Sequence, residues 1–292
     1  MKTTSAKRVR DTLRAGSIHM VGDGFHVRNL FPSNALGESI SPFLLLDYAG
    51  PTRYGPRTPA RGVGEHPHRG FETVTIVYQG RVAHRDSAGN SGVIGPGDVQ
   101  WMTAAAGVVH EELHDESFAR AGGVLQMVQL WVNLPAKDKL SAPKYQAIVA
   151  DSIPRVALDG GAGEARVIAG ELFGVRGPAT TFTPVNVGDA RLHAGAELAF
   201  EVPGGHNAAV VVLSGEVTVN ESRALGDAEM ALLDGDGERV VVRAAIDSLV
   251  LVLSGVPLGE PVVSHGPFVM NTGEEIYRAI KDFQSGKMGR LA

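Results

Sequence analysis

The chain has 292 residues, a formal net charge of −5 and no cysteine. Its length exceeds the roughly 100–200 residues of a typical domain, so there is room for two small β-barrels. The absence of cysteine excludes disulfides, thiolate metal ligands and a cysteine nucleophile, and the acidic balance disfavours nonspecific nucleic-acid binding, which needs a concentrated basic surface.

The N-terminal segment, residues 1–16, carries Lys, Arg and Asp among small residues and lacks the apolar core of a secretory signal. No apolar run in the chain approaches the roughly 20 residues that are needed to span a bilayer. We therefore predict a cytoplasmic protein without a membrane segment.

The segment His66-Pro67-His68 is the most informative part of the chain. Residues two apart on a strand share a face, so both imidazoles can point the same way, and His110 and Glu112 have the same spacing. Three imidazoles and a carboxylate that converge inside a small barrel form a site for a first-row transition metal. The alternative is that these histidines are satisfied structural residues.

Strand and turn signals surround these candidate ligands. Residues 73–78 are rich in β-branched side chains, and the turn signal Gly-Pro-Gly-Asp at residues 95–98 precedes a second predicted strand at 99–102. We expect the large side chains of these segments to pack in the core rather than to line a pocket for a flat aromatic ligand. They are Phe71, Ile76, Tyr78, Trp101 and Met102.

Other polar residues near the motif receive different assignments. Glu72 is an even number of residues away from His66 and His68, so on one continuous strand it would share their face. We assign it a supporting or structural role, since ligating histidines usually need a partner for the second ring nitrogen. Glu111 is expected to point away from the site, and His114 is interpreted as an ordinary solvated histidine. The remaining histidines stand alone and are interpreted as structural or surface residues: His19, His26, His84, His193, His206 and His265.

The second half of the chain repeats the pattern of strand and turn residues of the first. The segment 76–80 is echoed by 211–215, which predicts two copies of one supersecondary unit separated by a polar, proline-bearing connection at 137–143. Aligning the copies places Glu201 and Pro203 opposite the first histidine pair. It also places Arg239 and Val241 opposite His110 and Glu112. We therefore predict one metal per chain, in the first barrel.

The end of the chain has the signals of a short amphipathic helix. Thr272 and Glu275 form a capping box, and Ile276, Ile280 and Phe283 follow at helical spacing. A free helix is the less favourable alternative, because its apolar face would remain in water.

Five segments together resemble the pirin family and span nearly the whole chain. They are residues 66–75 (HPHRGFETVT), 96–103 (PGDVQWMT), 109–112 (VHEE), 41–51 (SPFLLLDYAGP) and 266–272 (GPFVMNT). The chain departs from the family at residues 104–107, Ala-Ala-Ala-Gly, where pirins more often carry a glycine and an arginine. A role ascribed to that arginine is therefore not carried over.

The resemblance implies an all-β fold, with two cupin (jelly-roll-like) β-barrels in tandem and a short C-terminal helix. The expected domains are a metal-binding N-terminal cupin barrel at 1–136 and a C-terminal cupin barrel without metal ligands at 144–255. The tail and helix at 256–292 are expected to pack back toward the first domain.

The resemblance also implies the cofactor, which is one divalent transition metal held by His66, His68, His110 and Glu112. Fe(II) is favoured, and Ni, Mn, Co, Cu or Zn are compatible with the same donors. Four protein ligands on a metal that prefers six leave open positions. A closed, tetrahedral structural zinc site is the alternative.

Some pirin-like proteins have quercetin 2,3-dioxygenase activity, so the resemblance implies a dioxygenase that opens a flavonol-type aromatic ring with dioxygen and releases carbon monoxide. Glu112 is then also the catalytic base for the substrate hydroxyl. The rival interpretation is a non-enzymatic, metal-bearing regulator that binds a protein partner, and a third is another cupin reaction such as an isomerisation. We expect a monomer that does not contact nucleic acid directly.

Overall fold

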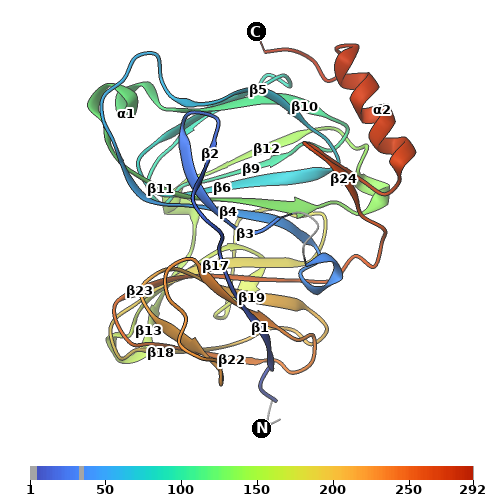
Figure 1. Ribbon diagram of the computed structural model, residues 1–292. Helices are drawn as coiled ribbons and strands as arrows, with labels where there is room; N and C mark the ends of the chain where they lie inside the picture. The colour runs from blue at the N-terminus through green and yellow to red at the C-terminus, as the bar shows by residue number, and fades with distance from the viewer. Residues whose placement is uncertain (1–4, 33–35, 292) are drawn as a thin grey trace. The chain divides into compact units, whose positions relative to one another are not determined.

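The computed structural model describes residues 5–32 and 36–291, and these form mostly β-strands (Figure 1). Two compact units can be distinguished. The first unit consists of residues 17–37, 43–150 and 259–292, and the second of residues 1–16, 38–42 and 151–258. Within the described parts of the chain, no helix is long and apolar enough to cross a membrane.

The first unit contains two antiparallel sheets. The seven-stranded sheet has the order β12-β9-β6-β11-β4-β3-β2 and the four-stranded sheet the order β5-β10-β7-β8. The strands of the larger sheet are β2 (His19–Val21), β3 (Phe25–Phe31), β4 (Phe43–Tyr54), β6 (Phe71–Gln79), β9 (Val99–Thr103), β11 (Gly123–Asn133) and β12 (Lys144–Ile148). Those of the smaller sheet are β5 (Gly62–His68), β7 (Val82–Asp86), β8 (Ser91–Ile94) and β10 (Val108–His114).

The two sheets of this unit enclose an apolar core. One cluster joins Val27 and Val77 of the larger sheet to Val82 and Ile94 of the smaller one. Strand β6 is buried at every position from Phe71 to Tyr78, which explains its continuous run of strand-forming residues. A short helix that the sequence analysis did not predict, α1 (Glu116–Ala121), also packs here through Phe118.

The second unit repeats this plan. Its seven-stranded sheet has the order β1-β21-β19-β23-β17-β14-β13, and its smaller sheet the order β18-β22-β20. The strands are β1 (Val9–Arg14), β13 (Arg155–Leu158), β14 (Gly163–Ala169), β17 (Val185–Leu192), β18 (Glu197–Glu201), β19 (Asn207–Ser214), β20 (Val217–Val219), β21 (Glu229–Leu233), β22 (Arg239–Ala244) and β23 (Ser248–Gly255). The short pair β15 (Glu171–Leu172) and β16 (Val175–Arg176) and the 3₁₀ turn η4 (Asp159–Gly161) complete it. The 3₁₀ turns η1 (Gly37–Ser39) and η3 (Ala150–Ser152) each begin with a residue of the first unit and end in the second.

The edge strands of the two large sheets differ from the expected domain boundaries. Strand β1, expected in the first domain, pairs with β21 of the second unit, and β12, expected in the second domain, pairs with β9 of the first. Both strands occupy the same edge position of the repeated sheet. Each strand therefore belongs to the unit whose sheet it extends by backbone pairing, although it lies on the other side of the expected boundary in the sequence.

The C-terminal segment belongs to the first unit. It forms the hairpin β24 (Val263–His265) and β25 (Phe268–Met270), followed by α2 (Gly273–Gln284) (Figure 1). The predicted capping box is present at the start of α2. Ile276 and Ala279 pack with Val109 of β10, whereas Phe283, expected on the apolar face, is 41% exposed.

Lys139 connects three segments of the first unit. Its buried ammonium group, which follows the 3₁₀ turn η2 (Ala136–Asp138), donates to Gly70 O at 2.7 Å, Asn133 Oδ1 at 2.6 Å and Val269 O at 3.0 Å. Burial lowers the pKa of Lys139 to about 7. The hydrogen bonds fasten the C-terminal hairpin to the turn that follows β5.

Candidate metal centre

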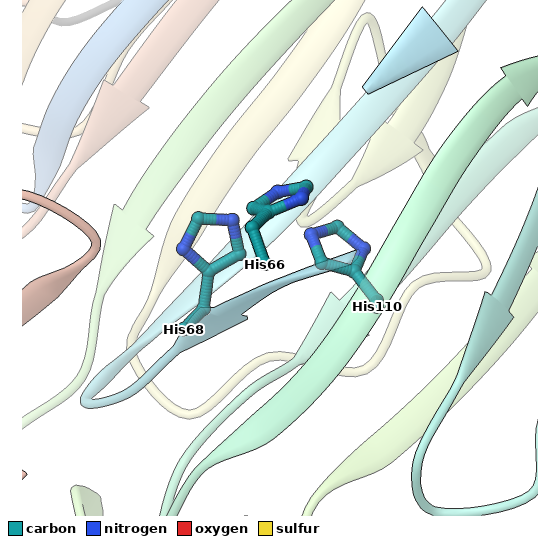
Figure 2. Close-up of side chains that lie close together, drawn as sticks. All are labelled: His66, His68 and His110. Carbon is teal, nitrogen blue, oxygen red and sulfur yellow. The ribbon is translucent and has the colours of Figure 1, made fainter. Parts of the chain in front are cut away.

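Three histidines converge inside the first unit. His66 and His68 lie on β5, and His110 lies directly opposite His66 on the neighbouring strand β10. Their potential ligand nitrogens all lie within 4.8 Å of one another, and Figure 2 shows the three rings side by side at the site. Among residues 5–32 and 36–291, this is the one group of three or more potential ligands that converges in this way.

The hydrogen bonds of these rings leave one nitrogen of each for a metal. His66 Nδ1 lies 2.8 Å from Gly64 O, and His68 Nδ1 lies 3.3 Å from Pro267 O. Because a carbonyl only accepts, each Nδ1 carries the proton and each Nε2 carries a lone pair. His110 Nε2 is buried and has no hydrogen-bond partner. The donor set therefore fits a divalent metal.

The electrostatics of the site keep His68 and His110 neutral. Burial, together with the neighbouring His66 ring, lowers the pKa of His68 to about 3. Burial and the surrounding imidazoles hold the pKa of His110 well below its usual value of 6.5. Neutral imidazole is the form that ligates metals, so His68 and His110 are ready to bind one at neutral pH.

Glu112 shares the interior face of β10 with His110 and is buried. Its Oε1 accepts a hydrogen bond from Thr75 Oγ1 at 2.9 Å and one from Gln100 Nε2 at 3.4 Å. The carboxylate is not part of the tight group of three histidines, and the pairing of β10 with β5 shifts register between His110 and Glu112. Its role as a fourth ligand stays a prediction.

Glu111 lies on the other face of β10, as expected. Arg85 Nε donates to its Oε1 at 2.5 Å, and the two residues are paired across β10 and β7. This carboxylate therefore points away from the histidines.

His84 of β7 is a site residue that the sequence analysis missed. It is 3% exposed, and its Nδ1 lies 3.4 Å from His110 Nδ1. On its other side, His84 Nε2 lies 3.2 Å from Asp86 Oδ2. The signal in the sequence was the spacing of His84 and Asp86, because two residues apart on a strand they share a face.

The interpretation of His114 as a solvated residue is wrong. Strand β10 continues through it, and the side chain is 3% exposed. Its Nε2 donates to Gly24 O at 2.9 Å, and its ring makes edge contacts with Phe25, Tyr54 and Phe118.

Two models of protein families match the chain, Pirin over residues 24–132 and the Pirin C-terminal cupin domain over residues 187–289. The chain belongs to the pirin family. The predicted fold, all-β with two cupin domains in tandem and a C-terminal helix, is confirmed.

Individual pirins and related structures are similar over almost the full length. A Pseudomonas aeruginosa protein with the provisional name quercetin 2,3-dioxygenase is 57% identical, over 93% of this chain and 95% of that protein. Human pirin is 37% identical, over 86% of this chain and 84% of its own. The crystal structure of a quercetin 2,3-dioxygenase from Acinetobacter baumannii superposes with a TM-score of 0.96 at 51% identity, covering 99% and 100% of the two chains.

The second cupin domain of this pirin carries no histidine at the positions equivalent to His66 and His110. Glu201 lies opposite Arg239 across β18 and β22, in the same way as His66 lies opposite His110 across β5 and β10. The predicted alignment of the two copies is therefore confirmed at this pair. A cavity of about 740 Å³ opens here and is lined in part by Glu201 and Pro203.

An aromatic wall stands beside His68 in the first cupin domain. The rings of Phe71 and Trp131 lie 5.0 Å and 5.3 Å from the His68 ring, and 4.3 Å from each other. Trp131 was not singled out from the sequence. The five large residues expected in the core are all at most 5% exposed: Phe71, Ile76, Tyr78, Trp101 and Met102.

Glu72 lies on the opposite face of β6 from Thr75, which reaches the site. The turn at Arg69-Gly70, where Gly70 has a φ of 89°, interrupts the alternation of faces between β5 and β6. An even separation from His66 and His68 therefore does not bring Glu72 to their face, as the sequence had predicted. Glu72 is 1% exposed and accepts from Thr103 Oγ1 at 2.7 Å. Burial raises the pKa of this carboxyl from 4.5 to about 7.

We expect Glu72→Gln to remove a pH dependence of stability. Between pH 4.5 and about 7 the folded chain binds more protons at Glu72 than the unfolded chain does, so the free energy of unfolding falls as the pH rises. Glutamine cannot titrate, and the variant should gain up to about 3 kcal/mol relative to wild type between pH 4.5 and pH 8.

Urea unfolding followed by tryptophan fluorescence measures this effect in the first unit, because both tryptophans, Trp101 and Trp131, lie there. The control is Glu116→Gln, whose side chain is 84% exposed. If the difference in the free energy of unfolding between Glu72→Gln and wild type does not change with pH, the raised pKa of Glu72 is contradicted.

Proposed function

We propose that this pirin is a metal-dependent dioxygenase that acts on flavonol-type, quercetin-like aromatic substrates. The observation that carries the proposal is the convergence of three imidazoles, with the buried Nε2 of His110 left without a hydrogen-bond partner. The similarity to proteins named quercetin 2,3-dioxygenase supports it.

His66, His68 and His110 would hold the metal through Nε2, with Glu112 as the proposed fourth ligand. Fe(II) is our first choice, and the same nitrogen and oxygen donors accept Ni, Mn, Co, Cu or Zn. When bound, such a metal supplies Lewis acidity toward a substrate hydroxyl and electron transfer to dioxygen.

Glu112 is the proposed base. Thr75 and Gln100 both donate to Oε1, which orients the carboxylate. We assign Oε2 to receive the proton of the flavonol hydroxyl. Trp131 is only partly buried and packs on the fully buried Phe71, so the Trp131 ring offers a surface beside His68 against which a flat ring can pack.

An oxygen-electrode assay with quercetin tests the proposal on samples loaded separately with Fe(II), Ni(II) or Mn(II). We expect loss of quercetin absorbance to match dioxygen uptake and carbon monoxide release, and to stop when the metal is removed. Loss under anaerobic conditions would contradict the mechanism. Bound metal without dioxygen uptake in all three samples would favour the alternative, a metal-bearing regulator with a protein partner.

The cytoplasmic location and the monomeric state remain predictions. Size-exclusion chromatography with light scattering tests the monomeric state, for which a mass near 30.7 kDa is expected.

A further inference from the structure

His84 and Asp86 lie behind the metal site and have no part in the reaction described so far. Their side chains are buried, and with His110 they form a continuous chain of polar contacts from a carboxylate to a candidate metal ligand. The direction of each hydrogen bond in this chain can be deduced from both of its ends.

At the first end, Asp86 fixes the proton of His84. The Asp86 Oδ1 accepts from the backbone N–H groups of Ala88 at 2.9 Å and Asn90 at 3.0 Å, so Oδ2 is the oxygen that faces His84 Nε2. A carboxylate only accepts, and therefore His84 Nε2 carries the proton. His84 Nδ1 is then left with a lone pair.

At the other end, Gln100 gives the same answer independently. Its Nε2 lies 3.3 Å from His84 Nδ1 and 3.4 Å from Glu112 Oε1, and its Oε1 accepts from Tyr145 at 3.2 Å. Because the Glu112 carboxylate requires a donor, Gln100 must present its NH₂ group there, and the same group faces His84 Nδ1.

The two constraints determine the state of His110. Its Nδ1 lies 3.4 Å from His84 Nδ1, an acceptor, and must therefore donate, which leaves the lone pair on the unpartnered Nε2. We propose that the Asp86–His84 pair, aided by Gln100, is a positioning relay that holds His110 in the Nδ1–H tautomer required for metal binding. The inference rests on the proposed metal site and deepens it.

Asp86→Asn is the variant that separates this role from a purely steric one. The backbone N–H groups of Ala88 and Asn90 will hold the new amide oxygen at the Oδ1 position, so the NH₂ group faces His84 Nε2. The Asn90 side-chain amide, which donates to Oδ2 at 2.9 Å in wild type, must turn its oxygen toward that NH₂ group. His84 would then carry its proton on Nδ1, facing His110. Two N–H groups cannot share that contact, and His110 would move to the Nε2–H tautomer, which has no lone pair on Nε2 to offer a metal.

Histidine tautomers are read from ¹⁵N–¹H correlation spectra of the metal-free protein labelled with ¹⁵N-histidine. We expect the Nδ1–H form of His110 in wild type and the Nε2–H form in Asp86→Asn, together with nickel(II) affinity that is roughly 10–100-fold lower. His84→Leu should lose affinity similarly, whereas His84→Gln, whose amide oxygen can accept from His110, should recover part of it.

The matched control is His114→Gln, which changes another buried histidine of the same unit and should leave nickel affinity unchanged. An unaltered His110 tautomer in Asp86→Asn would overturn the relay. If Asp86→Asn does not fold, the comparison of His84→Leu with His84→Gln tests the relay instead. Equal nickel affinities of these two variants would then overturn it. Neither readout requires turnover, so a failure of the dioxygenase proposal appears separately in the quercetin assay.

Discussion

Replacing His110 with alanine is expected to abolish tight metal binding while the chain stays folded. The change removes one of three convergent nitrogens, a larger loss than the roughly 10–100-fold drop that follows from removing an outer hydrogen-bond partner. The fold should survive, because two extensive apolar cores do not depend on one ion as a zinc finger does.

Titration of metal-free protein with nickel(II) measures the affinity, and circular dichroism with tryptophan fluorescence monitors the fold. His193→Ala is the control, since that histidine is 69% exposed and belongs to the second unit. If His110→Ala binds nickel as tightly as the control does, the site is placed wrongly. An unfolded His110→Ala chain would indicate a structural metal instead.

The adjacent carboxylates of β10 should differ sharply in their effect on activity. Glu112→Gln removes the proposed base and is expected to lower turnover of quercetin about 10²–10⁴-fold and to weaken metal binding. Glu111→Gln loses only the ion pair with Arg85 on the outer face, a contact of about 1 kcal/mol or less. Its turnover should stay close to that of wild type.

Assays at saturating metal separate the two roles of Glu112. A defect in Glu112→Gln that remains when metal content equals that of wild type belongs to the proton transfer, and a defect that disappears belongs to metal binding. Equal losses in the Glu111 and Glu112 variants, or the reverse order, would contradict the assignment of faces.

Local signals were sufficient for the parts of the structure that depend on short spacing. The alternation of strand side chains brought His66 and His68 to one face, and the capping box placed the start of α2 at Thr272. The internal repeat predicted the equivalence of Glu201 with His66, because both copies keep the same strand pairing.

Features that depend on long-range pairing could not be read in the same way. The edge positions of β1 and β12 follow from contacts with strands far away in the sequence. The alternation of faces along β5 did not predict the face of Glu72 on β6, because a tight turn separates the two strands. His84 and Trp131 contact the site from β7 and β11, and only the pairing of distant strands brings them to the histidines of β5 and β10.

Elemental analysis of the purified protein tests the central claim, a single metal site in the first cupin domain, most directly. One intact set of histidines and one copy that carries Glu201 and Arg239 in the equivalent positions predict about one transition metal per chain, which His110→Ala should lose. A content near two metals per chain, or one that His110→Ala leaves unchanged, would contradict the account.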